Sequence, residues 1–182
     1  MALGTWNIDP SHSAIAFSVR HMVISKARGR FTKWSGELQF DADKPRASSV
    51  QVTIDPASID TAEAQRDAHL RSADFLEVEK FPTASFRSTK VEEVESGVYR
   101  VTGDLTVHGV TKSVILDVVY EGTGKDPWGG ERAGFSGSTT IDRKDFGLRW
   151  NQALETGGVL VGDKVELMLE IEAVKQAAQK VA

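Results

Sequence analysis

Residues 99–120 read YRVTGDLTVHGVTKSVILDVVY, and this stretch decides the fold. Tyr99, Val101, Leu105 and Val107 alternate with mostly polar residues as far as the turn-like HGVT at 108–111. Beyond that turn, Val114, Leu116, Val118 and Tyr120 again share one parity. A period of two is typical of strands with one dry and one wet face. Such strands belong to an antiparallel sheet rather than to a βαβ fold.

The same alternation recurs along most of the chain. We expect eight or nine strands, at about residues 4–9, 13–21, 27–41, 48–55, 83–91, 97–107, 111–122, 131–142 and 163–174. All five prolines fall between these runs, as their missing N–H group requires. Within 27–41 the parity of the large apolar residues changes between Phe31 and Leu38, so we predict a β-bulge there.

Long antiparallel strands in one chain favour a barrel, because closure removes the exposed edges of a flat sheet. We therefore expect an all-β protein, an extended eight-stranded antiparallel barrel with a short helical excursion around 60–76. Such a barrel is either filled by side chains or just wide enough for one slim ligand. The 182 residues suit a single domain, which we place at 1–174, with 175–182 as a helix-prone, frayed C-terminal tail.

The helical excursion interrupts the strands between residues 57 and 82. AEAQRDAHLR has no β-branched residue, Asp60 or Thr61 can cap its start, and a second turn can begin at Ser72. Asp67 and Arg71 have the i,i+4 spacing of an ion pair, and a helix that balances its own charges needs no function. Alternatively, the segment is a lid whose basic side chains meet a charged head group. Catalysis by His69 with a neighbouring aspartate is a third interpretation.

Composition excludes several kinds of site. The net charge is −4 and the basic residues form no run, which argues against nucleic acid as a partner. With no cysteine, disulfides, thiolate nucleophiles and Cys-based metal sites are excluded. No stretch approaches a membrane span in length, and no apolar run of signal-peptide length precedes Asp9. We therefore expect a cytoplasmic protein without a transmembrane segment.

The four histidines, His12, His21, His69 and His108, have no helical i,i+3 or i,i+4 spacing. We predict no metal site, and we expect His108 to occupy a turn and His12 to hydrogen-bond locally. No serine-nucleophile or phosphate-loop motif is present in the sequence. We accordingly predict no catalytic residues, no cofactor and no enzymatic activity.

The aromatic residues have two interpretations, a packed core or the lining of a tunnel. Small residues within the strands favour some hollow, because they remove volume that side chains would otherwise fill. These residues are Ala14, Ala16, Gly103, Gly134, Ser136, Gly137 and Ser138.

Several motifs resemble those of the YceI-like family of lipocalin-like, polyisoprenoid-binding proteins. They are WNIDPSHSAIAFSVRHM, RGRFTKWSGELQFD, SIDTAEAQRDAHLRSADFLEVEKFPTASFRS, GDLTVHGVTKSVILDV and GFSGSTTIDRKDFGL. Together they cover about residues 5–174 in the family's order. Leu76 and Phe81 stand where family members often carry Phe and Tyr, so we expect an altered pocket shape rather than lost binding. Many members are secreted, whereas no signal peptide is visible here.

The resemblance implies an apolar barrel tunnel that takes a long isoprenoid lipid, such as a polyprenyl phosphate or a quinone. We place its tail among Phe17, Val19, Phe31, Trp34, Leu38, Phe75, Phe86, Leu105 and Phe135. We place its head group at Arg66, His69 and Arg71. Two alternatives stay open: a small hydrolase or isomerase that uses His69 or His21, and a promiscuous scavenger of hydrophobic compounds. An edge strand near imperfect barrel closure could also pair two chains into a homodimer.

Overall fold

A computed structural model describes residues 3–177 of the chain. Its strands are β1 (Gly4–Ile8), β2 (Ala14–His21), β3 (Ser25–Phe31), β4 (Trp34–Phe40), β5 (Ser49–Ile54), β6 (Ile59–Asp60), β7 (Ala84–Glu95), β8 (Val98–Val107), β9 (Val110–Lys125), β10 (Glu131–Asp142) and β11 (Val161–Lys175). The helices are α1 (Ala64–Arg71) and the 3₁₀ turns η1 (Pro10–His12), η2 (Pro45–Ala47), η3 (Pro56–Ser58) and η4 (Arg143–Phe146).

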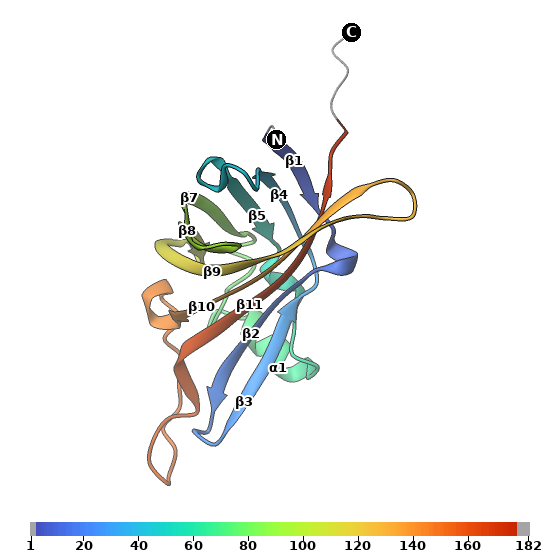
Figure 1. The fold of residues 1–182 in the computed structure, drawn as a ribbon. Helices are drawn as coiled ribbons and strands as arrows, with labels where there is room; N and C mark the ends of the chain where they lie inside the picture. The colour runs from blue at the N-terminus through green and yellow to red at the C-terminus, as the bar shows by residue number, and fades with distance from the viewer. Residues whose placement is uncertain (1–2, 178–182) are drawn as a thin grey trace.

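The sheet closes into a barrel where β1 pairs with β11 (Figure 1). The strand order is β1-β4-β5-β7-β8-β9-β10-β11, and β1 then pairs with β11, which makes a ring of eight. Each of these pairings is antiparallel. The predicted all-β, eight-stranded antiparallel barrel with one short α-helix is therefore confirmed.

Three further strands extend the barrel. The last residues of β11 pair with β1, at Ile8 and Ala173, whereas its earlier residues, from Val161 to Glu170, pair with β2. From β2 the sheet continues through β3 to the short β6. Figure 1 shows β2 and β3 running down from the ring as a long hairpin, with α1 beside them.

The predicted β-bulge between Phe31 and Leu38 is wrong. The expected strand 27–41 is two strands, separated by Thr32 and Lys33. β3 pairs with β2 and β6, whereas β4 pairs with β1 and β5. A two-residue break between strands changes the phase of the apolar residues in the same way as a bulge, so sequence parity cannot distinguish them.

The turn at 108–109 follows directly from local chemistry. His108 and Gly109 join β8 to β9, and both have positive φ, at 54° and 70°. A two-residue hairpin turn needs this left-handed geometry, so the prediction of a turn at His108 is confirmed.

The helix begins two or three residues later than the predicted caps. The side chain of Glu63, not that of Asp60 or Thr61, accepts hydrogen bonds from the first backbone N–H groups of α1. After α1 the backbone N–H of Phe75 donates to the carbonyl of Ser72 at 3.0 Å, which confirms the second turn. None of the helices within residues 3–177 combines the length and the hydrophobicity that a bilayer crossing requires.

The C-terminal prediction is partly wrong. Lys175 still belongs to β11 and pairs with Trp6, and the backbone N–H of Gln176 donates to Thr5 at 2.8 Å. These residues therefore lie in the barrel rather than in a frayed tail. Residues 178–182 of the expected tail lie outside the described residues.

Candidate ligand-binding cavity

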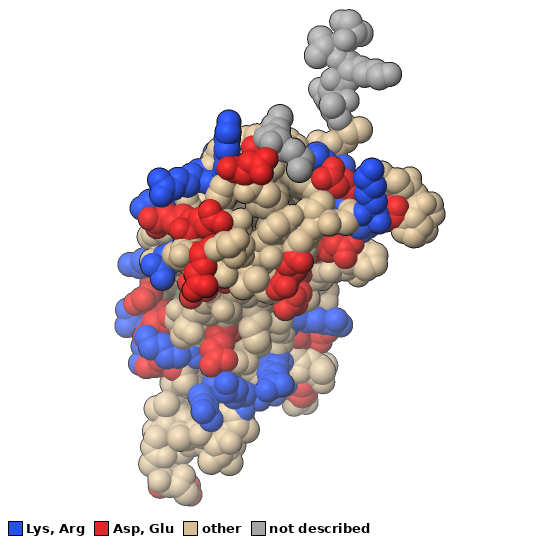
Figure 2. Space-filling view, viewed as in Figure 1, with Lys and Arg blue, Asp and Glu red and all other residues tan. Residues whose placement is uncertain are grey.

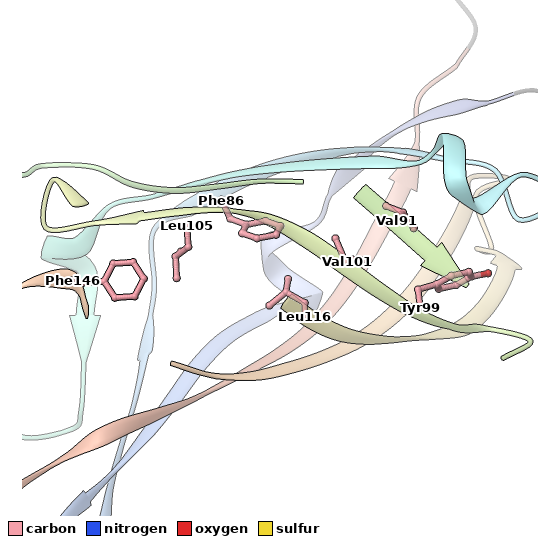
Figure 3. Close-up of a cluster of buried hydrophobic side chains, with 7 residues drawn as sticks. All are labelled: Phe86, Val91, Tyr99, Val101, Leu105, Leu116 and Phe146. Atoms are coloured by element: carbon pink, nitrogen blue, oxygen red, sulfur yellow. The ribbon is translucent and has the colours of Figure 1, made fainter. Parts of the chain in front are cut away.

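The barrel encloses a cavity of about 320 Å³ with an almost wholly apolar wall. One side of that wall is a cluster of buried side chains on β7, β8, β9 and η4, shown in Figure 3: Phe86, Val91, Tyr99, Val101, Leu105, Leu116 and Phe146. All but Phe146 line the cavity. On the opposite wall, β11 contributes Val165, Leu167, Leu169 and Ile171. The alternating apolar residues of the sequence are thus the inner face of the barrel.

Most residues that we predicted to line a tunnel lie in this wall. Eight of the nine do so, namely Phe17, Val19, Phe31, Leu38, Phe75, Phe86, Leu105 and Phe135. The ninth, Trp34, lies outside the described cavity wall. It is the first residue of β4 and pairs with Ile54. Its half-buried side chain packs against a second cluster of buried apolar residues, on β1, β4, β10 and β11. Contact of the eight with a ligand stays a prediction.

The small residues contribute to the hollow unequally. A Cβ atom at Gly103 would collide with the ring of Phe86, so that ring already fills the space. Ala14 is exposed. Ser136 and Gly137, in contrast, do line the cavity. Gly103 therefore makes room for a side chain of the wall rather than for a ligand.

Different elements form the two ends of the cavity. At one end the wall includes Leu70, Phe75 and Leu76 from α1 and the following turn. At the other it includes Gln39, Ser48 and Ser49, near η2. Burial raises the pKa of Tyr99, which also lines the cavity, with the charge of Glu93 a smaller cause. Its hydroxyl therefore stays protonated at neutral pH.

Arg143 also lines the cavity, although its position in the sequence predicts no role for it. Only 3% of this residue is exposed. Its Nε donates to the carbonyl of Gly162 at 2.8 Å. Nη1 donates to Leu148 at 2.7 Å and to Trp150 at 2.9 Å, and Nη2 donates to Val161 at 3.3 Å. One guanidinium thus holds together the segments before and after the loop between η4 and β11.

The charge of Arg143 is buried but not isolated. Burial lowers its pKa, and the carboxylates of Asp163 and Asp142 oppose that shift. Asp163 lies 3.8 Å from Nη2. An arginine stays protonated under these conditions. Because Trp150, which Arg143 binds, packs against His69 and Phe75, this fixed positive charge lies at the α1 end of the cavity. The letters IDRKDF could not reveal this, because the acceptors are backbone carbonyls 5 to 19 residues further along the chain that only the fold brings to one side chain.

The charges of α1 do not pair within the helix as the i,i+4 spacing suggested. Asp67 is buried and accepts hydrogen bonds from the backbone N–H and the hydroxyl of Thr61, at 2.9 and 2.5 Å. Arg71 donates to the carbonyls of Ala57 and Ile59. Arg66 also donates to Thr61, through Nε and Nη2. These side chains attach α1 to the segment before it.

His69 has a different environment. Its Nε2 lies 2.8 Å from the carboxylate of Asp74. Its ring packs edge-on against Trp150 and Phe75, with centroids 4.6 and 5.1 Å away. The ring therefore connects α1 with the segment that Arg143 anchors. None of Arg66, His69 and Arg71 belongs to the described wall of the cavity, and their contact with a head group stays a prediction.

Among the described residues, one group of side chains has the spacing of metal ligands: Asp9, His12 and Glu172. His12 bonds locally to Asp9 at 2.9 Å, as predicted. The guanidinium of Arg132 donates to both Asp9 and Glu172. Hydrogen bonds from Ser11, then His12 and Arg132, hold the pKa of Asp9 well below its usual value. The positive charge next to the carboxylates of Asp9 and Glu172 is thus the guanidinium of Arg132.

Comparison with known proteins identifies relatives of this chain. A UPF0312 protein of Ectopseudomonas mendocina is 46% identical over 167 residues, which are 91% of this chain and 83% of the relative. BcnA of Burkholderia cenocepacia has a similar structure, with a TM-score of 0.81 and 25% identity over 91% of this chain and 98% of its own.

A polyisoprenoid binding domain from Saccharophagus degradans shares the fold at a TM-score of 0.68. Its identity is only 15%, over 96% of this chain and 100% of that domain, so this likeness concerns the fold alone. The model of the YceI-like domain matches residues 6–173. Since that match spans nearly the whole barrel, the chain belongs to the YceI-like family.

Proposed function

We propose that this protein binds one long-chain isoprenoid lipid inside the barrel and sequesters or carries it. The supporting observation is a closed barrel around a cavity whose wall is almost wholly apolar. Each buried CH₂ group contributes about 0.8 kcal/mol, so a chain of isoprene units needs few polar contacts. The net affinity is much smaller than that sum, because ordering a flexible chain is unfavourable. A relative of the same fold is described as a polyisoprenoid binding domain.

We propose that the tail lies between the β8–β9 wall and the β11 wall, and that the head group lies at the α1 end. The fixed charge of Arg143 in the cavity wall favours a phosphate or a polarised quinone oxygen at that end. The basic side chains of α1 lie outside the described wall, so they meet a head group only where it projects from the cavity. Arg66 and Arg71 each use Nε and Nη2 in the hydrogen bonds described above. Since a guanidinium has five N–H donors, Nη1 remains for a ligand.

The catalytic alternative has one observation in its favour, the 2.8 Å contact of His69 with Asp74. Neither His69 nor His21 belongs to the described wall of the cavity, whereas a general base must reach the proton it removes. We therefore propose binding rather than catalysis. Turnover of a lipophilic ester that disappears in His69→Gln would reverse this choice.

The test is mass spectrometry of an organic extract from the purified protein, together with its native mass. We expect about one isoprenoid per chain, and its mass identifies the head group and the tail length. Phe17→Trp and Phe86→Trp place a larger ring in the cavity and should lower that occupancy. Val119→Trp is the control, because Val119 is 40% exposed on the outside of β9.

Unchanged occupancy in both cavity variants would contradict the proposed tail position. Absence of any lipid, with no uptake of added polyprenyl phosphate or quinone, would contradict the function. Competition with a straight-chain alcohol of equal length separates a selective carrier from a promiscuous scavenger, since only the scavenger binds both equally.

A further inference from the structure

The lower end of the molecule in Figure 1 carries two loops side by side. One is the turn between β2 and β3, and the other precedes β11. We call residues 22–25 and 151–160 together the tip. Met22 donates its backbone N–H to the carbonyl of Leu160 at 2.9 Å, which joins the two loops. Glu155 is the only ionisable side chain in these two stretches of sequence, and Figure 2 shows the tip almost free of charge.

The tip exposes large apolar side chains. The exposed fractions are 43% for Met22, 61% for Val23, 82% for Ile24 and 43% for Val159. Val23 contacts the second loop, since a Cβ atom at Gly158 would lie 3.2 Å from its Cγ2. Scattered exposed apolar residues are ordinary, but a contiguous group of them marks an interaction surface.

The backbone of the turn is unfavourable for the residues it carries. Met22 and Val23 have φ values of 51° and 66°. This left-handed region suits Gly or Asn, and a β-branched residue in it is a rare exception. Because both side chains are exposed, packing within the barrel does not explain why they occupy this turn.

Basic side chains lie directly behind the tip. Arg20 and Lys26 face each other across the β2–β3 ladder, next to the turn, and Arg28 follows on β3. All three are exposed. Lys26 pairs with Glu166 at 3.2 Å. Figure 2 shows Lys and Arg side chains gathered where the tip joins the barrel, although the whole chain has a net charge of −4.

We propose that the tip docks the protein on a bilayer that contains anionic phospholipids. Met22, Val23 and Ile24 enter the interfacial layer, where an apolar projection gains from burial. Arg20 and Arg28 then lie at the level of the lipid phosphates, to which basic side chains near a membrane are attracted. The single carboxylate of Glu155 stays in the hydrated head-group layer. Docking needs no cargo, so it is independent of the proposed isoprenoid binding.

The position of the tip gives docking a consequence for the cavity. His21, which precedes the turn, pairs with Val161, and Val161 lines the cavity. A docked tip therefore holds the α1 end of the barrel, rather than the η2 end, close to the bilayer.

The test is flotation of the full chain with vesicles, which contain no isoprenoid. Vesicles of phosphatidylcholine with phosphatidylglycerol should carry the protein up the gradient, and phosphatidylcholine alone should carry much less. Ile24→Asp should weaken binding about tenfold or more. Ile115→Asp is the matched control, because Ile115 is 49% exposed on the barrel wall. High salt should weaken wild-type binding, since it screens the basic side chains.

A double variant separates docking from folding. Met22→Asn with Val23→Gly places residues that tolerate positive φ in the turn, so thermal stability should stay level or rise while flotation falls. Equal flotation of wild type, Ile24→Asp and the double variant would overturn the proposal, as would a wild type that floats with neither vesicle. The tip would instead bind a second copy of the chain if native mass spectrometry showed a wild-type dimer, Ile24→Asp were a monomer, and the two proteins floated equally.

Discussion

Arg143→Met is the substitution with the largest expected effect on stability. The variant keeps an apolar side chain of similar length but removes a buried guanidinium that donates four hydrogen bonds to backbone carbonyls. Burial has already stripped those carbonyls of water, so they lose their partners without replacement. Removing one partner of such a buried charged network lowers the free energy of unfolding by about 3–5 kcal/mol. For a chain of this size each kcal/mol lowers Tm by roughly 2–4 °C.

The measurement is reversible urea denaturation of wild type, Arg143→Met and Arg143→Lys, with thermal unfolding alongside. Arg143→Lys should lie between the other two, because an ammonium keeps the charge but lacks the planar fork that reaches several carbonyls. Arg149→Met is the control, since Arg149 is an exposed arginine of the same loop. A loss below about 1 kcal/mol in Arg143→Met, similar to that of the control, would refute the argument that these hydrogen bonds hold the loop.

Three further predictions concern single sites. Gly103→Ala should destabilise the barrel by about 1–3 kcal/mol, because the new Cβ would lie 2.6 Å from a backbone carbonyl oxygen. Gly124→Ala is the control in the same denaturation assay and should leave stability unchanged, because Gly124 has open space around it. Asp9→Asn should lower the free energy of unfolding at neutral pH. In the folded protein the pKa of Asp9 is held below its usual value of 3.8, chiefly by the hydrogen bond from Ser11. The Asp9 carboxylate therefore stabilises the fold above pH 3.8, and this stabilisation is lost as the pH falls through the lowered pKa. The gap between wild type and Asp9→Asn should accordingly narrow in acid, and a gap independent of pH would contradict this origin. Asp67→Ala should leave the backbone N–H and the hydroxyl of Thr61 without an acceptor, which lowers the free energy of unfolding by about 1–3 kcal/mol. The variant should also be cleaved faster by a protease within residues 57–82. Cleavage as slow as in the wild type would show that other contacts hold α1 in place.

The strand faces could be predicted from the sequence because a half-buried strand repeats every two residues. The run from Val165 to Ile171 has one parity, and those side chains do line the cavity. β7 is more difficult, because its pairing with β8 shifts between Ser88 and Lys90. Phe86 and Val91 therefore both face inward although their parities differ.

The errors arose where contacts made only in the folded chain decide the outcome. Thr32 and Lys33 separate β3 from β4 because the sheet offers these strands different partners, and no local pattern contains that information. Asp67 bonds to Thr61 rather than to Arg71, since a buried carboxylate gains more from two donors than from an exposed ion pair. Arg143 was overlooked for the same reason, because its acceptors lie on segments that only the folded chain brings together.

The position of β11 has a consequence for how the barrel forms. This strand pairs with β10, β1 and β2, and Ile8 meets Ala173 only after all the residues between them have been synthesised. During synthesis, the apolar faces of the earlier strands therefore stay open until β11 has left the ribosome. Pairing of such distant strands is slow, and the unpaired edges invite association with other chains meanwhile. Nascent chains that lack β11 should accordingly depend on chaperones, and deletion of 161–175 should yield aggregates rather than a smaller barrel.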